Sequence, residues 1–395
     1  MGALTGVRVI DMSSVIAGPF AANLLADFGA EVIKVEMPGK GDAFRQMGPY
    51  SRDGKSIRWS SMSRNKKSIT LDLHFEEGKK LFLELVAKSD VIIENFRTGT
   101  LDKWGLDMET LKAANPKIIV TRITGYGQTG PRKSLSGFGT PCTAFSGVTY
   151  CCGYPDRPPV SPSYSMADYN AGLFAVVGTM IALYNRDAKG GDGQEIDVSL
   201  YESLFRTQET LVADYFINGH IRERTPKMSG SASPSGTFQT RDGKWVVIVC
   251  STDRTFSYIA NAWGREDLKE KYAKTIDRLR DDDFIMQTTA DWVAGLDYQE
   301  LVKICNREGV PVDLIYSIED IFGDEHYAAR EDIVEVPDDI FGTMKMPAVH
   351  PVLSGTPGKI EWAGPKLGSY NDEIYRGLLG LDEQAVGALK EKNII

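Results

Sequence analysis

Short apolar runs and helical patterns alternate along the first part of the chain. Val7 to Met12 and Glu31 to Glu36 have the pattern of short strands, and Gly18-Pro19 opens a helix between them that extends to about Phe28. A unit of strand, helix and strand about thirty residues long predicts parallel strands joined by a right-handed crossover.

The same alternation continues to about residue 200. It predicts further strands at 68–73, 91–95, 118–124 and 195–200, and helices at 76–87, near Leu101 and at 169–184. Strands that alternate with helices in this way predict an α/β fold with an open parallel sheet.

The pattern changes at about residue 220. Residues 222–236 are polar and rich in Ser, Gly and Pro, which is typical of a loop or a domain boundary. Strands at 244–250 and 310–314, amphipathic helices between 253 and 307 and a helix near Ile318 predict a second, smaller α+β domain. The tail after about 340, with a terminal helix from Asp382, fits either domain.

Composition indicates an ordinary globular protein. The 395 residues are many for a single core, 42% of them are hydrophobic and the net charge is −9, which argues against a nucleic-acid or anionic-membrane surface. The five cysteines form no CxxC pair and have no nearby histidine, so neither a disulfide framework nor a zinc site is expected. No signal peptide or bilayer-spanning apolar run is evident, and we expect a cytoplasmic protein.

Several loops after strands are candidates for ligand binding. The turn at 12–19 lacks GxGxxG, which argues against a nicotinamide or flavin site, yet its helix start either binds an anion or is only a tight turn. Residues 64–67, 95–97 and Lys103 either offer cations to a phosphorylated ligand or are solvated surface groups. The glycine-rich turn at 125–131 either approaches a ligand closely or is structural.

Asp168 is isolated in charge. It is the one charged residue between Arg157 and Arg186, and it precedes an apolar segment, 173–183, that has the composition of a buried helix. Its carboxylate is either a helix cap or a nucleophile or base in a dry site. The four histidines lack metal-ligand spacing and no GxSxG motif occurs, so neither a metal site nor a Ser-His-Asp hydrolase is predicted.

Taken together, short segments in order along nearly the whole chain resemble the class III CoA-transferases, the group of formyl-CoA transferase and carnitine CoA-transferase. These segments are Ala17-Gly18-Pro19, residues 29–36, Asn65-Lys66-Lys67-Ser68, Glu94-Asn95-Phe96, Gly125-Tyr126-Gly127-Gln128 and Ala167-Asp168. The stretch from Ala144 to Phe216 is most similar to the carnitine-type branch.

The resemblance implies a domain plan and an assembly. A large Rossmann-like, CoA-binding and catalytic domain is expected at 1–205, a linker and lid at 206–236, a small domain at 237–335 and a segment returning to the large domain at 336–395. Family members are interlocked dimers, so a homodimer or a hetero-oligomer with a homologous subunit is expected.

The resemblance also implies an activity, the transfer of CoA from an acyl-CoA to a free carboxylic acid. Asp168 takes the place of the family's nucleophile, which passes through aspartyl-anhydride and aspartyl-CoA intermediates. Coenzyme A and acyl-CoA are substrates, and no tightly bound cofactor or metal is expected. The CoA contacts correspond to Val15, Ala17, Leu71, Asn95, Phe96 and Lys103. Met37 and His74 stand where formyl-CoA transferase has arginine and lysine.

The acceptor side is less well defined. Ile16 replaces a glutamine of formyl-CoA transferase, which makes oxalate a poor candidate acceptor. We expect the pocket near Ile16 and residues 138–152, with aromatic walls from Phe138, Phe145, Tyr150 and Tyr164, although all four could be core residues. The stretch 229–236, with Gly230 and Gly236, is expected to form a stiff lid or a plain connector between domains.

Two alternatives remain. An α-methylacyl-CoA racemase of the same fold needs a histidine shortly after the glycine-rich turn, where this chain has Phe138 after Gly137, so that chemistry is disfavoured. The chain could also be a non-catalytic CoA-binding subunit of a hetero-oligomeric transferase, although it retains Asp168.

Overall fold

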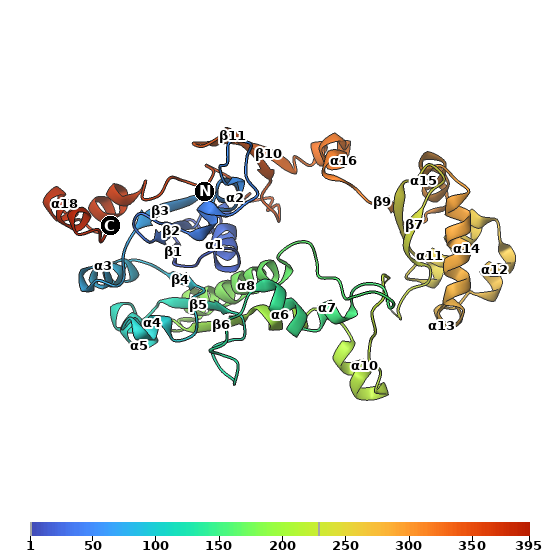
Figure 1. Cartoon of the computed structure of the whole chain (residues 1–395), viewed down its shortest axis with the longest axis horizontal. Helices are drawn as coiled ribbons and strands as arrows, with labels where there is room; N and C mark the ends of the chain where they lie inside the picture. The colour runs from blue at the N-terminus through green and yellow to red at the C-terminus, as the bar shows by residue number, and fades with distance from the viewer. Residues whose placement is uncertain (1, 228–229) are drawn as a thin grey trace. The chain divides into compact units, whose positions relative to one another are not determined.

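The computed structural model describes residues 2–227 and 230–395, and the chain forms two compact units (Figure 1). The larger unit comprises Met1–Thr149, Ser161–His220 and Ala328–Ile395, and the smaller comprises Tyr150–Val160 and Ile221–Tyr327. Each unit has its own hydrophobic core.

The larger unit is built on a six-stranded parallel sheet, which confirms the predicted fold class. Its strand order is β3-β2-β1-β4-β5-β6. The strands are β1 (Arg8–Asp11), β2 (Glu31–Glu36), β3 (Lys66–Thr70), β4 (Val91–Glu94), β5 (Ile119–Thr124) and β6 (Glu195–Ser199). The central strands are buried on both faces, which explains their continuous apolar runs.

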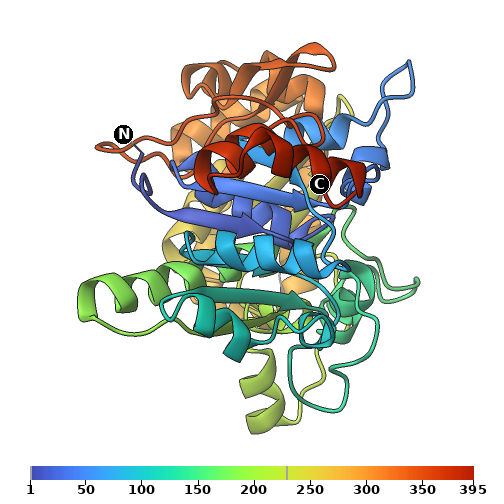
Figure 2. The ribbon, with the colours of Figure 1, turned by 90° about the vertical axis from the view of Figure 1, so that its left-hand side faces the viewer.

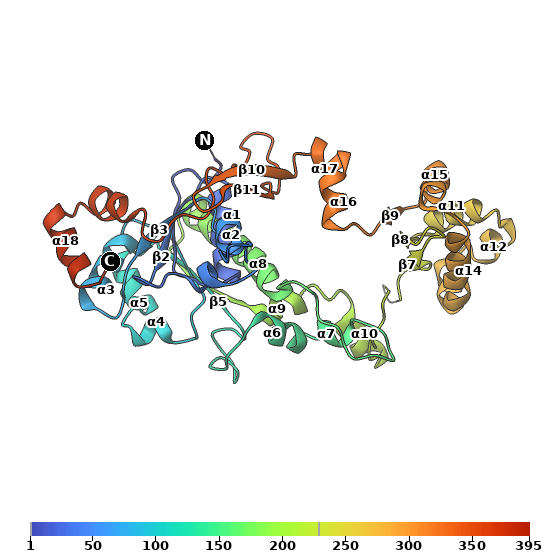
Figure 3. The ribbon, with the colours of Figure 1, turned by 45° about the horizontal axis from the view of Figure 1, so that its top comes forward.

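Helices cover both faces of this sheet. One face, toward the viewer in Figure 2, carries α3 (Glu76–Val86), α4 (Thr100–Lys103), α5 (Met108–Ala114), the π-helical turn η2 (Glu373–Leu378) and α18 (Glu383–Glu391). The other carries α1 (Ala17–Asp27), α6 (Gly139–Phe145), α8 (Met166–Lys189) and α9 (Leu200–Phe205). Figure 3 shows α1 and α8 on the opposite side of the strands from α3 and α18.

The remaining elements of the larger unit are short. They are the 3₁₀ turn η1 (Ala43–Gln46), α2 (Ile57–Met62), α10 (Leu211–Asn218) and a hairpin of β10 (Ile333–Asp338) and β11 (Gly342–Pro347). Two further helices, α7 (Val148–Cys151) and α17 (Glu325–Ala329), cross the unit boundaries.

The end of the chain packs on the larger unit. The main-chain amide of Asp72 donates to the Ile394 carbonyl at 2.8 Å, and the Tyr375 hydroxyl donates to the Thr70 carbonyl at 2.6 Å. Residues 336–395, expected from the sequence to return to the large domain, therefore belong to its fold.

The smaller unit combines an antiparallel sheet with a layer of helices. Its strand order is β7-β8-β9, with β7 (Ser235–Gln239), β8 (Trp245–Val249) and β9 (Val312–Leu314). Its helices are α11 (Asp253–Trp263), α12 (Glu266–Lys271), α13 (Thr275–Arg280), α14 (Asp282–Ala294), α15 (Tyr298–Glu308) and α16 (Ile318–Gly323).

The segment expected as linker and lid, 206–236, divides between the two units. Residues up to His220 belong to the larger unit and include α10, and Gly236 lies within β7. Ser229, the first residue of the expected lid, lies outside the described residues.

The expectation that the apolar segment 173–183, part of α8, is buried is wrong for its large side chains. Small residues of α8, among them Ala171 and Ala175, are buried, and a Cβ at Gly172 would come within 3.0 Å of the Ala17 carbonyl of α1. Small side chains on one side let α1 approach, and this leaves the large ones outside: Val177 is 53% and Ile181 64% exposed. By length and composition α8 could also cross a bilayer, but a helix packed on a sheet passes the same test.

Candidate active site

A cavity of about 240 Å³ opens where the strand order of the large sheet reverses, between β1 and β4. In open α/β sheets, ligands bind outside the carboxyl ends of strands at such a point. Residues at or just beyond the ends of three strands line the cavity together with Lys133, residues 135–138 and Asp168; they include Ser14, Val15, Ile16, Ala17, Asn95, Phe96, Thr124 and Gly125.

Asp168 lies in the first turn of α8, and its side chain faces this cavity. Ser165 occupies the N-cap position, so Asp168 is not the cap residue that the sequence left as an alternative. Burial raises the pKa of Asp168 to about 6, and the main-chain N–H of the same residue opposes this only partly. Within the described part of the chain, no side chain donates a hydrogen bond to this carboxylate or forms an ion pair with it.

Two residues of α6 lie close to Asp168. A Cβ built on Gly139 would lie 2.0 Å from Asp168 Oδ2, so only glycine fits here without moving the carboxylate. Burial, together with the negative charge of Asp168, raises the pKa of Cys142 to about 11 and keeps the thiol protonated. The two α6 residues beside the Asp168 carboxylate are therefore small and uncharged.

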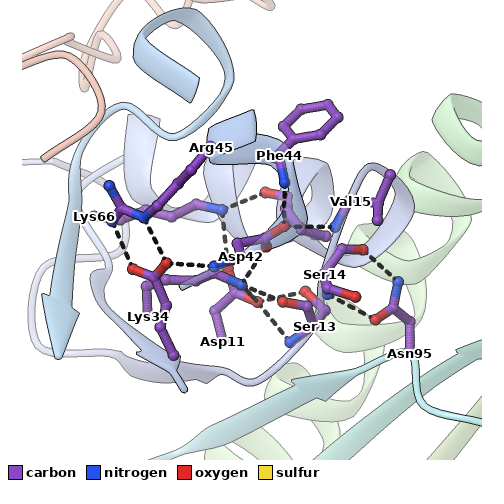
Figure 4. Close-up of polar contacts among 12 residues, drawn as sticks. Asp11, Ser13, Ser14, Val15, Lys34, Asp42, Phe44, Arg45, Lys66 and Asn95 are labelled. Carbon is purple, nitrogen blue, oxygen red and sulfur yellow. Dashed lines mark hydrogen bonds and ion pairs between the residues drawn. The ribbon is translucent and has the colours of Figure 1, made fainter. Parts of the chain in front are cut away.

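The turn between β1 and α1 is fixed by Asn95 at the end of β4 (Figure 4). The Asn95 side chain accepts from the Ser14 amide at 2.8 Å and donates to the Ser14 carbonyl at 2.7 Å. Next to it, Glu94 accepts from the Phe96 amide at 2.6 Å, and burial raises the pKa of Glu94 to about 7. Asn95 and Glu94 thus fix the main chain on both sides of the switch point.

A second, more apolar cavity of about 200 Å³ shares Ser14 and Phe96 with the first. Leu71, Met37, His74 and Trp104 line it. The Trp104 ring meets those of Phe96 and His74 edge to face, at centroid distances of 5.2 and 5.5 Å. The two cavities are therefore neighbours, with Ser14 and Phe96 in the wall of each.

The structure brings most of the predicted site residues together. Val15, Ile16, Ala17, Asn95, Phe96, Phe138 and Asp168 line the first cavity, and Leu71 lines the second. Lys103 is exposed on α4 and lines neither cavity. Gly230 and Gly236 belong to the smaller unit.

Two other groups lie differently from what the sequence suggested. Of the four aromatic residues considered for the pocket wall, only Phe138 lines the cavity; Phe145, for example, packs against Tyr126 and Tyr201. The cations at 64–67 are engaged in ion pairs within the fold, Arg64 with Asp27 at 2.7 Å. Sequence reasoning missed Gly139 and Asp42, and it did not identify Lys34 and Lys66, which lie within segments that resemble the family, as buried ion-pair partners near Val15. Among residues 2–227 and 230–395, no group of three His, Cys, Asp or Glu side chains is placed to hold a metal ion.

Comparisons with known proteins agree with the geometry. The model of CoA-transferase family III matches residues 4–371. The chain is 43% identical to the succinyl-CoA–L-malate CoA-transferase beta subunit of Chloroflexus aurantiacus over 397 residues, 99% of this chain and 98% of that protein. It is 41% identical over 394 residues to the succinyl-CoA–D-citramalate CoA-transferase of the same organism, covering 99% of this chain and 98% of that protein.

Solved structures give the same assignment. The crystal structure of a CAIB/BAIF family protein from Brucella suis superimposes with a TM-score of 0.81 at 30% identity, covering 95% of this chain and 99% of that one. A whole-chain family match, relatives named as CoA-transferases and a fold shared with a CAIB/BAIF protein agree with one another. The chain belongs to CoA-transferase family III and is an acyl-CoA:carboxylate CoA-transferase.

Proposed function

We propose that this enzyme transfers CoA through covalent intermediates on Asp168. The observation that carries the proposal is a largely buried carboxylate, with no paired cation among the described residues, facing a cavity at the sheet's switch point. A carboxylate without a counter-ion is poorly stabilised in its ground state and so is a better nucleophile.

In the proposed reaction, an Asp168 oxygen attacks the thioester carbonyl and expels the CoA thiolate, giving an aspartyl–acyl anhydride. The thiolate attacks the aspartyl carbonyl, which releases the first acid and leaves an aspartyl-CoA thioester. The acceptor carboxylate then attacks this thioester to form a second anhydride, and the returning thiolate attacks its acyl carbonyl. The new acyl-CoA leaves and the Asp168 carboxylate is restored. Because the anhydrides hydrolyse, water must be excluded, and burial of Asp168 supports this requirement.

We infer that donor and acceptor are dicarboxylic acids or their thioesters, with succinyl-CoA as the donor. Two relatives are named for succinyl-CoA with L-malate or D-citramalate, and another is named a succinate–glutarate CoA-transferase. Arg97 and Lys133 line the cavity and supply positive charge for a free second carboxylate or a phosphate of CoA. A proton-abstracting racemase is disfavoured because that reaction needs bases on both sides of the carbon, and no histidine lines the cavity that Asp168 faces.

We propose that the exposed apolar side of α8, with α10, binds a second copy of the chain or a homologous subunit. Val177, Ile181 and Tyr184 of α8 are more than half exposed, and Phe216 of α10 is 87% exposed. Large exposed apolar side chains on a helix surface are typical of an interface. Relatives named as alpha and beta subunits support either partner.

The direct test uses succinyl-CoA and a panel of free acids, with CoA esters detected by mass spectrometry. Wild type is expected to form a new acyl-CoA, and hydroxylamine is expected to trap an aspartyl hydroxamate at Asp168. Asp168→Ala should abolish transfer while free CoA still binds. Transfer at near wild-type rate in Asp168→Ala would contradict the mechanism. If the chain binds CoA but transfers none without a partner, it is the non-catalytic subunit.

A further inference from the structure

Four charged side chains are buried together beneath the β1–α1 turn (Figure 4). This buried charge cluster consists of Asp11 at the end of β1, Lys34 in β2, Asp42 in the loop after β2 and Lys66 in β3, and each side chain is at most 1% exposed. Lys66 Nζ lies 2.9 Å from Asp11 Oδ2, and Lys34 Nζ lies 3.0 Å from Asp42 Oδ2 and 3.7 Å from Asp11 Oδ1. The charges balance in number, two of each sign.

The cluster holds the turn at several points. Lys34 donates to the carbonyl of Ser13, and Lys66 donates to the carbonyl of Pro19 at 2.7 Å. Asp42 Oδ1 accepts from the amide of Val15 at 3.2 Å and from the amide of Phe44 at 2.9 Å. The main chain that lines the cavity facing Asp168 is therefore held from below by buried charges.

Val15 has the least favourable backbone conformation in this turn, so it depends on stabilising contacts. Its φ is +66°, in the left-handed region, which a β-branched residue rarely adopts because its side chain crowds the main chain. The half-buried side chain packs with Ile16, Phe44 and Trp59. Strain of this kind persists only where surrounding contacts impose it, and it concentrates at functional sites.

We propose that Asp42 is a positioning residue for CoA transfer, which keeps Val15 in the left-handed conformation so that Ile16 and Ala17 form the wall of the cavity facing Asp168. This role rests on the proposed function only in that the turn is taken to bind the acyl-CoA. Asp42 does not line the Asp168 cavity, and its buried side chain is among the residues around the second cavity.

A carboxylate is required here because both of its sides face donors. One oxygen accepts two main-chain N–H groups and the other pairs with Lys34. Burial by itself would raise the pKa of Asp42, but Lys34 and these amides more than offset it and lower the pKa. An asparagine would have to turn its NH₂ group either toward the Val15 and Phe44 amides or toward Lys34, so one side would always place donor against donor.

The test is a double-mutant cycle with Asp42→Asn and Val15→Gly. Glycine adopts a positive φ without steric cost, so a turn with glycine at position 15 depends less on Asp42. In the wild-type background, Asp42→Asn is expected to weaken free CoA binding, measured by calorimetry, and to raise the KM for acyl-CoA by about tenfold. In the Val15→Gly background, the same change should cost about threefold or less in affinity and in KM.

Asp27→Asn is the matched control. Asp27 is buried and paired with Arg64 at the far end of α1, so its loss should lower the urea midpoint of unfolding without changing the KM. Equal penalties for Asp42→Asn in both backgrounds, or an unchanged KM and CoA affinity, would overturn the proposal. If Asp42→Asn alone does not fold, recovery of folded protein in the double variant supports the proposal, and failure to recover contradicts it.

The proposed function and this inference can fail separately. If wild type transfers no CoA to any acid tested, the proposed function is wrong. The same cycle measured by urea unfolding still tests whether Asp42 holds Val15, because it needs no activity.

Discussion

Replacing Asp168 with asparagine is expected to stabilise the folded protein while it abolishes transfer. Burial raises the pKa of this carboxyl from 3.8 to about 6, because the folded protein disfavours its charged form. Below about pH 3.8 both the folded and unfolded states are protonated at this site. As the pH rises from there to about 6, the folded state keeps a proton that the unfolded state has lost, so stability falls until the pH exceeds about 6.

The size of this effect follows from the shift. Two pKa units correspond to about 3 kcal/mol of folding free energy lost at pH 7 and above. Asparagine carries no charge, and an amide buried without a partner costs about 1 kcal/mol. The net gain in the free energy of unfolding of Asp168→Asn is therefore about 2 kcal/mol at pH 7 to 8, and it should fall to zero at about pH 4.5.

Urea unfolding followed by tryptophan fluorescence between pH 4 and pH 8 measures this gain. The difference between Asp168→Asn and wild type should grow through the window from about pH 4 to about pH 6 and then level off. Asp156→Asn, an exposed turn position, is the control and should show no comparable trend. A variant less stable than wild type at pH 8, or a difference that does not change with pH, would refute the reasoning.

Three further changes test the site and its surroundings. Gly139→Ala should lower kcat about a hundredfold because its Cβ displaces the Asp168 carboxylate. The control Gly387→Ala, where the added Cβ meets open space, should transfer CoA at the wild-type rate in the same assay. Burial raises the pKa of Glu94 to about 7, so wild type should lose stability as the pH rises from about 4.5 through about 7. In thermal unfolding, Glu94→Gln should show a smaller loss over this range. Ile181→Glu should shift the protein toward monomer in analytical ultracentrifugation, and an unchanged mass distribution would contradict an interface at this side of α8.

The large sheet could be predicted from the sequence because its strands are buried on both faces. Residues 31–36 form a strand with the predicted bounds, and helix 76–87 ends one residue early, at Val86. The strands that were missed are less apolar or interrupted: β7 contains Gly236, and β10 contains Pro337. Such segments pair because of their neighbours in the fold, and a period along the sequence gives little sign of it.

The site could be predicted only where a residue contrasts with its own surroundings in sequence. Asp168 stood out because its neighbours are uncharged, and Asn95 because it ends an apolar strand. Gly139 and Asp42 have no such contrast. Gly139 matters because a Cβ there would lie 2.0 Å from the carboxylate of Asp168, 29 positions away in the sequence. Asp42 matters because it accepts from the amide of Val15, 27 positions away. The exposed side of α8 was mistaken for core because an apolar residue looks the same in the sequence whether it lies in an interface or in an interior.

The distribution of positive charge connects these observations. Lys34 and Lys66 lie beneath the same turn that lines the Asp168 cavity, yet both are paired with Asp11 and Asp42. A lysine left free to reach Asp168 would lower the pKa of that carboxyl and make it a weaker nucleophile. Burial raises the pKa of Asp168 to about 6, so the group is still about nine-tenths ionised at pH 7 and more basic than an ordinary aspartate. The buried charge cluster thus holds the wall of the cavity in place, and its paired lysines do not lower the pKa of the Asp168 carboxyl.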